Sequence, residues 1–195
     1  MSESSITSRL ENWDENKPLT REEAVEILNL PEEEMSKLLD CAYALRTKYK
    51  GKKVSVQLLT NVRSGNCSQN CAYCAQSRDS EAPIEKYRRV SDEKLYGDND
   101  LVDEKHLARH CIGLSGIGFS DEEIEDLADR IREMKKKETQ ICCSIGFLTE
   151  KQAKMLKEAG LDRINHNLNS SRSFYPEICT THTYEQRVNN IKMLQ

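Results

Sequence analysis

Three capping boxes in the second half of the chain constrain its fold more than any other feature. Each begins at Ser120, Thr149 or Thr183 and has Glu or Gln three residues later. In such a box the two side chains satisfy backbone N–H groups at the start of a helix. A short apolar run precedes each box, at 110–116, 141–145 and 161–165. Strands that alternate with helices over short links predict parallel βα units.

The first part of the chain predicts helices of its own. Thr20 opens a fourth capping box, and Pro31 suits the first position of the following helix. That helix has an apolar face that includes Cys41, which we expect to be an ordinary buried thiol. We therefore divide the chain into a helical lead-in, residues 1–50, and an α/β part, residues 51–195.

The α/β part predicts the first half of a barrel. A strand at 54–59 joins the three apolar runs, so four strands are expected. A closed (β/α)8 barrel typically needs about 250 residues. The chain stops at Gln195 inside an amphipathic helical pattern. The predicted fold class is α/β, the first half of a (β/α)8 TIM-type barrel preceded by N-terminal helices.

One connection is predicted to be irregular. Residues 91–110 should hold the helix between the first two strands, but Gly97 and the Asp, Asn and Asp after it interrupt the pattern. Gly, Asp and Asn are weak helix formers. We therefore expect a broken helix or a loop there.

Charge and hydropathy argue against several function classes. The net charge of −4 gives no electrostatic footprint for nucleic acid or an anionic membrane. No apolar run approaches a transmembrane span, and the first ten residues lack the apolar core of a signal peptide. We expect a cytoplasmic protein with neither nucleic acid nor membrane as a partner. In a reducing compartment, eight cysteines favour metal binding or catalysis over disulfides.

The run CSQNCAYC holds three of these cysteines in a C-x3-C-x2-C spacing. Cys67, Cys71 and Cys74 lie among Ser, Gln and Asn, where nothing resembles a core. No fourth ligand is evident nearby, whereas a structural zinc takes four. An iron–sulfur cube held by three cysteines leaves one iron open to a small molecule. We favour the cube; the alternatives are a zinc site completed by a distant ligand, and thiols without metal.

These residues resemble a known motif, the C-x3-C-x-aromatic-C of radical S-adenosylmethionine (SAM) enzymes, with Tyr73 as the aromatic. Three stretches resemble biotin synthase in particular: SGNCSQNCAYCAQS, HCIG and ICCSIGFLTEKQAKMLKEAGLDRINHNLNSSRSFYPEICTTHTYEQR. The resemblance covers roughly residues 54–195. Its NHNL and FYPEICTTHTYEQR segments are the most specific.

The resemblance implies the chemistry of the first cluster. Cys67, Cys71 and Cys74 would hold a 4Fe–4S cluster, and its fourth iron would chelate the amino and carboxylate groups of SAM. One-electron reduction would then cleave SAM to methionine and a 5′-deoxyadenosyl radical. The cofactor carries that chemistry and the protein positions it.

The resemblance also implies a second cluster. Cys111 and Cys142 match cysteines that hold a 2Fe–2S cluster, the proposed sulfur donor, at the ends of two predicted strands. Strand alternation lets only one of Cys142 and Cys143 face the barrel interior, and Cys142 aligns with the family pattern. A third cysteine and an arginine ligand would lie beyond Gln195. The alternative is that Cys111 and Cys142 are ordinary core thiols.

Substrate and cofactor contacts are expected near the fourth strand. Asn165 and Asn167 match the pair that grips the ureido ring of dethiobiotin, and alternate residues of one strand point to the same side. Asn169 would contact the ribose of SAM, although the family usually has Asp there, and Tyr73 would also contact the cofactor. Arg187 matches an arginine near the methionine carboxylate. The alternatives are a turn-capping role for the Asn pair and a solvated helix face for Arg187.

Other residues of ligand type receive structural roles. His166 and His182 are both metal ligands by type. His166 lies between two inward-facing Asn residues, so strand alternation directs it to the other side, and we expect it to be structural. We expect the same of Cys179.

The sequence therefore predicts a radical SAM sulfurtransferase of the biotin synthase type, which inserts sulfur into dethiobiotin. By resemblance, an electron donor such as flavodoxin or ferredoxin is a partner, and the full-length protein is a homodimer. The alternatives are a methylornithine synthase or hydrogenase-maturation type of relative, and a non-catalytic metal-binding fragment. We expect the 195 residues alone to be inactive toward dethiobiotin, because the ligand set of the second cluster is incomplete.

Overall fold

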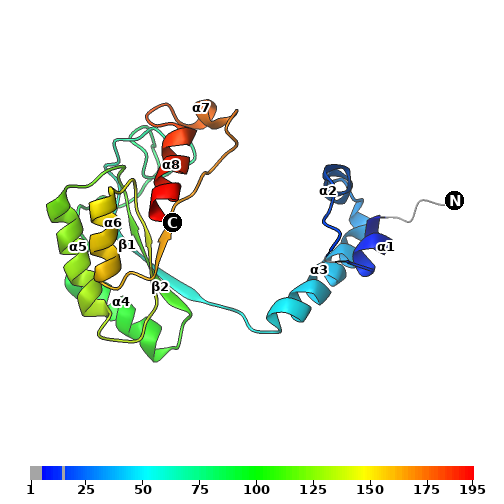
Figure 1. The fold of residues 1–195 in the computed structure, drawn as a ribbon, viewed down its shortest axis with the longest axis horizontal. Helices are drawn as coiled ribbons and strands as arrows, with labels where there is room; N and C mark the ends of the chain where they lie inside the picture. The colour runs from blue at the N-terminus through cyan, green and yellow to red at the C-terminus, as the bar shows by residue number, and fades with distance from the viewer. Residues whose placement is uncertain (1–5, 15) are drawn as a thin grey trace. The chain divides into compact units, whose positions relative to one another are not determined.

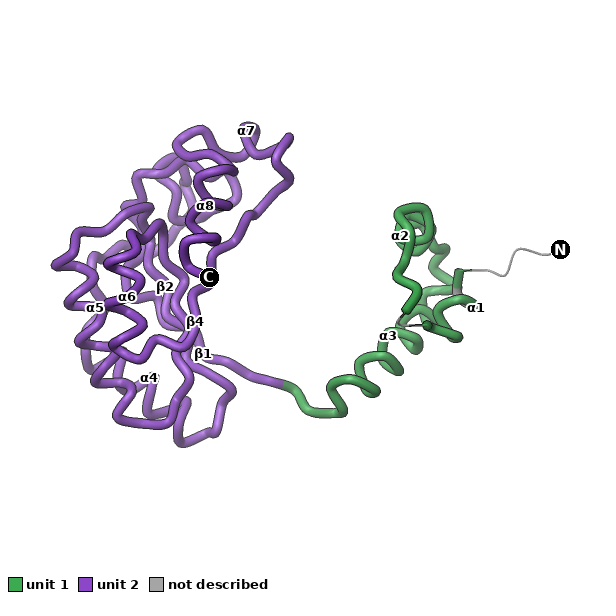
Figure 2. Tube along the Cα trace, in the orientation of Figure 1, with its two compact units in different colours: residues 1–54 green, residues 55–195 purple. Residues whose placement is uncertain are grey.

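The chain divides at residue 54 into two units, Met1–Val54 and Ser55–Gln195 (Figure 2). The structure, a computed structural model, describes residues 6–14 and 16–195. Among these residues, no helix combines the length and the apolar character that crossing a membrane requires.

The first unit is helical in the residues described. Its elements are α1 (Ile6–Glu11), α2 (Arg21–Leu28), the 3-10 helix η1 (Glu32–Glu34) and α3 (Met35–Lys50). The predicted capping box opens α2: Thr20 Oγ1 accepts from the Glu23 N–H at 3.1 Å, and Glu23 Oε2 accepts from the Thr20 N–H at 2.8 Å. Pro31 has extended backbone, ψ 155°, and precedes η1 rather than forming its first residue, so its predicted position was wrong. Cys41 lies in a small apolar cluster, as expected.

The second unit contains the parallel sheet that the sequence predicts. Its strands are β1 (Gln57–Arg63), β2 (Arg109–Leu114), β3 (Ile141–Ser144) and β4 (Arg163–Asn165). They pair in the order β1-β2-β3-β4, and every neighbouring pair is parallel. The four described strands form an open sheet, with β1 and β4 as its edges.

Helices follow the strands, and the first three of them cover one face of the sheet (Figure 1). They are α4 (Asp92–Glu104), α5 (Asp121–Met134), α6 (Glu150–Glu158), the short α7 (Tyr175–Ile178) and α8 (Tyr184–Leu194). All three predicted capping boxes are formed, at the starts of α5, α6 and α8. Each supplies hydrogen bonds to N–H groups that the first helical turn leaves without partners.

Side chains alternate between the two faces of the sheet. In β1, Thr60 and Val62 are buried. Leu59 and Asn61, which alternate with them, are exposed, Leu59 by 63%. The core on the helix side of the sheet is mostly aliphatic and includes Val62, Leu95, Ile112, Ile124, Leu127, Ile131, Ile141, Leu148 and Leu156. The opposite, concave face of the second unit is therefore free to carry polar and ligand residues.

The predicted break in the first connecting helix was wrong. α4 runs without interruption through Gly97, Asp98 and Asn99. The carboxylate of Asp98 accepts hydrogen bonds from Thr60 Oγ1 at 2.6 Å and from Lys94 Nζ. Asn99 Nδ2 donates to the Met134 carbonyl at 3.1 Å. Tertiary contacts to buried polar side chains thus outweigh their weak intrinsic helix propensity.

The first strand is also displaced from its predicted place. It was expected at 54–59 but spans 57–63, and Val54 and Val56 are 76% and 53% exposed. The bounds of β1 are set by its pairing with β2, which runs from Gln57 opposite Arg109 to Arg63 opposite Leu114.

Leu95 and Leu101 offer a matched test of how α4 packs. Leu95 is fully buried and Leu101 is 39% exposed on the same helix. Leu95→Ala should lower the free energy of unfolding by about 2–5 kcal/mol, as for other large-to-small core changes. Leu101→Ala should cost less than half of that, because much of its side chain already meets water. Denaturant unfolding of both variants measures the two losses, and equal losses would contradict this placement of α4.

Candidate active site

Loops at the carboxyl ends of the four strands enclose an open cavity of about 220 Å³. Parallel strands bring these ends to one edge, which is where sites form in βα folds. The cavity is lined by eight of the residues predicted for function: Cys67, Cys71, Tyr73, Cys74, Asn165, Asn167, Asn169 and Arg187. Cys111 and Cys142 lie outside it.

Gly146 lets two of these loops approach closely. The Phe147 N–H donates to the Ile117 carbonyl oxygen at 2.6 Å. A Cβ atom at Gly146 would overlap that same oxygen. Any side chain at this position would push the loops after β2 and β3 apart and deform the cavity wall.

The cysteine loop follows β1 and folds on its own backbone. The Cys74 N–H donates to the Cys71 carbonyl at 3.1 Å, and the Arg78 N–H donates to the Gln69 carbonyl at 2.9 Å. Cys71 is buried, whereas Cys67 is half-buried. Cys74, also half-buried, packs against a buried cluster of Cys71, Tyr175 and Cys179.

Asn70 fastens this loop to the segment before α8. Its Oδ1 accepts hydrogen bonds from the Thr180 N–H at 3.1 Å and from the Thr181 N–H at 3.3 Å. Its Nδ2 donates to Thr180 Oγ1 at 2.7 Å. The Ala72 N–H also donates to the Ile178 carbonyl at 2.9 Å. The amide of one side chain thus satisfies backbone groups of a distant segment.

Cys71 meets Cys179 at this junction, with 3.8 Å between the two Sγ atoms. Burial, together with the neighbouring Cys179, raises the pKa of Cys71 to about 11. Burial also acts on Cys179, but hydrogen bonds from Thr181 and from the His182 backbone outweigh it and lower its pKa. Cys179 is therefore the first of the pair to ionise.

His182 borders the same two thiols and is 5% exposed. Its Nδ1 lies 2.9 Å from Gln69 Oε1, and its Nε2 accepts a hydrogen bond from Arg187 Nε at 3.2 Å. These partners fix the tautomer that carries its proton on Nδ1. Burial, assisted by the positive charge of Arg187, lowers the pKa of His182 to about 4, so the ring is neutral at physiological pH.

Arg187 points into the site instead of lying on a solvated helix face. Its Nε is 2.6 Å from Tyr175 Oη, and its Nη1 donates to the Asn167 carbonyl at 3.2 Å. The guanidinium also lies 5.9 Å from the centre of the Phe147 ring. Tyr175 is 2% exposed, so Arg187 rests against a fixed partner.

Two of the residues predicted to touch the cofactor contact each other. Asn169 Nδ2 donates a hydrogen bond to Tyr73 Oη. Asn169 has a φ of +67°, in the left-handed region that Asn tolerates better than most residues. The pair joins the cysteine loop to the segment that follows β4.

The Asn pair lies at the end of β4. Asn165 is the last strand residue, and Asn167 lies just beyond it; both are exposed and line the cavity. His166 between them is half-buried and packs on Phe147, with 5.5 Å between ring centres. Strand alternation was expected to direct His166 away from the two Asn side chains, but its ring borders the same cavity, so its structural role stays a prediction.

Cys111 and Cys142 lie within the sheet, deeper than the cavity. They are register partners on β2 and β3, and their row continues to Leu59 and Arg163 on the outer strands. Both lie inside their strands, so their predicted position at the strand ends was wrong. Burial, with the neighbouring Cys111, raises the pKa of Cys142 to about 11. Cys143 belongs to the helix-side core.

Comparison with known proteins shows the family. A family model of the Radical SAM superfamily matches residues 61–195. The chain belongs to the radical SAM superfamily. It is 40% identical over 180 residues to the biotin synthase of Lysinibacillus sphaericus, an alignment that covers 92% of this chain and 54% of the relative. It is 41% identical over 176 residues to that of Bacillus subtilis strain 168, covering 90% and 52%.

The chain spans about half the length of the curated relatives it matches. A solved structure, that of methylornithine synthase (PylB), superposes with a TM-score of 0.82 over 97% of this chain and 55% of that one, at 16% identity. At that identity the likeness shows the fold alone. The predicted α/β fold with a parallel sheet is confirmed, and the four described strands correspond to part of such a radical SAM fold.

Sequence reasoning missed several residues that build the site. Asn70, Gln69 and Tyr175 were given no role, because the partners of Asn70 and Gln69 lie about 110 positions away and the partner of Tyr175 lies on the next helix. Cys179 was expected to be structural. The C-x-x-H spacing of Cys179 and His182 was the one local signal that pointed to them.

The thiols of the cysteine loop should differ in reactivity from the others. A neutral alkylating reagent added to the folded, metal-free chain should label the half-buried Cys67 and Cys74 first. The fully buried Cys143 should react only after unfolding, since a thiol must reach solvent to be alkylated. Peptide mass spectrometry over time gives the order. Labelling of Cys143 as fast as Cys67 would contradict the packing described here.

Proposed function

We propose that this chain forms the SAM-activating part of a biotin synthase-type sulfurtransferase. The observation that carries the proposal is the gathering of Cys67, Cys71, Cys74 and Arg187 around one cavity, at the carboxyl edge of the sheet, in a radical SAM family member. The similarity to biotin synthases at about 40% identity supports the choice among relatives.

The donor set fits an iron–sulfur cluster. The loop offers three thiols and no carboxylate on the cavity, and thiolate is the usual ligand of these clusters. The half-buried Cys67 and Cys74 would bind the cluster on the side of the site that faces solvent, and the buried Cys71 would bind it on the inner side. When bound and reduced, a 4Fe–4S cluster would supply the electron that cleaves SAM to a carbon radical.

The other polar groups of the cavity are suited to hold SAM. Arg187 is fixed by Tyr175 and keeps nitrogen donors for a carboxylate, a charge-assisted contact. Asn169 and Tyr73, joined to each other, present an amide and a hydroxyl where a ribose could bind. In this proposal these residues orient SAM and the cluster supplies the electron.

Dethiobiotin is the proposed substrate, held by Asn165 and Asn167. Each amide has a donor and an acceptor, which suits a cyclic urea. Cys111 and Cys142, side by side on the concave face, are the proposed thiolates from this chain for a 2Fe–2S sulfur donor. An electron donor such as a flavodoxin or ferredoxin, a homodimer and a cytoplasmic setting complete the proposal; the eight free cysteines suit a reducing compartment.

Metal analysis tests the first cluster. Anaerobic reconstitution of the chain with iron and sulfide should give broad visible absorption and about four irons per chain from the C-x3-C-x2-C site. Cys71→Ser should abolish the cluster, because it removes one of three thiolates. Cys41→Ser, in the other unit, is the matched control and should keep it. A Cys71→Ser variant that binds as much iron as the parent would refute the assignment.

Arg187 tests the SAM site. Arg187→Ala in the cluster-loaded chain should weaken SAM binding by about 1.5–3 kcal/mol, the range for a hydrogen bond to a charged group. Arg172→Ala is the control, since the Arg172 side chain is 67% exposed and pairs with Glu185. Equilibrium binding of SAM measures both. Equal affinity of the parent and Arg187→Ala, with the iron content unchanged, would remove Arg187 from the site.

A further inference from the structure

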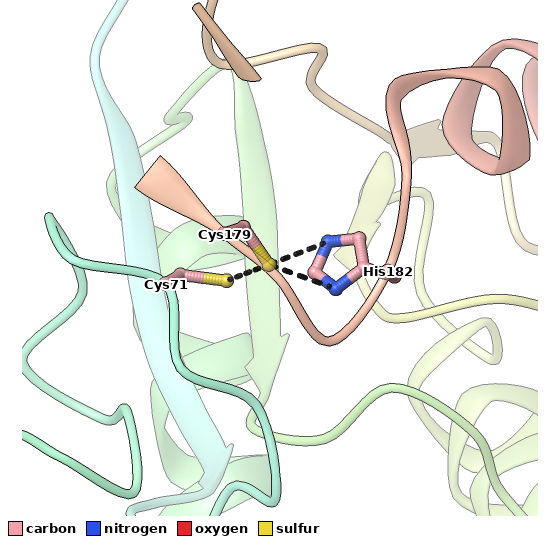
Figure 3. A group of neighbouring side chains, drawn as sticks. All are labelled: Cys71, Cys179 and His182. Atoms are coloured by element: carbon pink, nitrogen blue, oxygen red, sulfur yellow. Dashed lines mark hydrogen bonds between the residues drawn. The ribbon is translucent and has the colours of Figure 1, made fainter. Parts of the chain in front are cut away.

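Cys71, Cys179 and His182 form a group that the proposed function does not use as a unit. One ligand atom from each lies within 4.8 Å of the others, and all three side chains are buried. Figure 3 shows both sulfurs and the ring turned toward one another. We call this group the thiol–imidazole triad. Thiolate and imidazole are the ligands that proteins most often offer to zinc.

Two of the three distances within the triad are close to those around a single tetrahedral ion. Two sulfurs each about 2.3 Å from one tetrahedral zinc lie about 3.8 Å apart. The Sγ atoms of Cys71 and Cys179 are 3.8 Å apart. A zinc-bound sulfur and imidazole nitrogen lie about 3.6 Å apart by the same geometry. Cys179 Sγ is 3.8 Å from His182 Nε2 and nearer to Nδ1, at 3.2 Å, so the imidazole must rotate to turn Nε2 toward a shared ion.

The surroundings of His182 also suit a ligand. Zinc-binding imidazoles usually donate their other N–H to an oxygen, which fixes the tautomer. His182 Nδ1 already has Gln69 Oε1 at 2.9 Å, which leaves Nε2 for an ion. The present partner of Nε2 is Arg187 Nε, which retains Tyr175 Oη at 2.6 Å if the ion takes its place.

We propose that Cys71, Cys179 and His182 bind one zinc ion when the chain holds no iron–sulfur cluster. The two thiols release their protons to solvent on binding, and a water molecule completes the tetrahedron. Zinc is favoured over ferrous iron at such a site, because it binds nitrogen and sulfur ligands more tightly.

The triad shares Cys71 with the proposed cluster, so the two centres exclude each other. This second step rests on the proposed function. A chain that has bound zinc cannot complete the C-x3-C-x2-C ligand set until the ion leaves. In the cluster-free protein, bound zinc therefore keeps Cys71 and Cys179 coordinated, and cluster assembly is delayed until the ion leaves.

Single substitutions distinguish the triad from the cysteine motif. The reduced, metal-free chain is titrated with Zn²⁺ against a chelator of known affinity. The parent should bind one zinc, and Cys179→Ser and His182→Gln should weaken it at least about 10-fold. Cys67→Ser, which removes a motif thiol outside the triad, should bind as the parent does. If Cys67→Ser loses zinc while Cys179→Ser keeps it, the ion belongs to the motif and the proposal fails.

A measurement on the parent chain guards against variants that do not fold. X-ray absorption at the zinc edge counts the ligands of the bound ion directly. The triad should give two sulfurs and light-atom neighbours that include imidazole. Three sulfurs, or a parent chain that binds no zinc, would overturn the proposal.

Competition is tested by reconstitution with iron and sulfide after zinc loading. One equivalent of zinc should slow cluster formation in the parent and have no such effect in Cys179→Ser. An equal rate with and without zinc in the parent would overturn the exclusion. If the zinc-free parent forms no cluster at all, the proposed function fails, whereas the zinc titration still decides the triad.

Discussion

Asn70 joins the cysteine loop to a segment 110 residues later, and the arrangement of the site depends on this contact. Its carboxamide oxygen accepts from the Thr180 and Thr181 backbone, and its NH2 group donates to Thr180 Oγ1 at 2.7 Å. Closing so long a loop costs chain entropy, which several simultaneous hydrogen bonds offset. Because the two segments are held together, Cys71 faces Cys179, and His182 and Arg187 are brought to the same cavity. Metal-binding and cofactor-binding groups are thereby organised by one amide that carries no chemistry of its own.

The sheet supplies the second constraint, by sorting the cysteines of β2 and β3. Residues opposite one another in register share a face, so Cys111 and Cys142 lie side by side. Cys143, one position along, joins the aliphatic core beneath the helices. A shift of β3 by one residue would exchange the two neighbours and place a core thiol on the concave face. The register that keeps the core apolar is therefore also what pairs the two candidate ligands.

Local signals in the sequence predicted the elements well and the long-range contacts poorly. Capping boxes at Ser120, Thr149 and Thr183 involve residues three apart, so the start of each helix can be inferred from its own sequence. The prediction for α4 was wrong because it relied on the weak helix propensity of Asp98. In the structure Asp98 is held in the helix by hydrogen bonds from β1 and from a residue one turn earlier in α4. The cysteine motif was recognisable by spacing. The roles of Asn70 and Tyr175 were not, because only the fold brings their partners near.

Burial protects thiols of this site from solvent, but it also raises the pKa of some of them and so makes metal binding harder. The same burial that protects Cys71 and Cys142 raises the pKa of each to about 11, so neither thiol ionises appreciably at neutral pH. A metal ion must therefore displace a proton from each, and its binding weakens as the pH falls. Cys179 differs, since hydrogen bonds from Thr181 lower its pKa despite burial. A thiolate thus forms first beside Cys71, where an incoming cation would meet it, and the charge of that cation then makes ionisation of Cys71 easier.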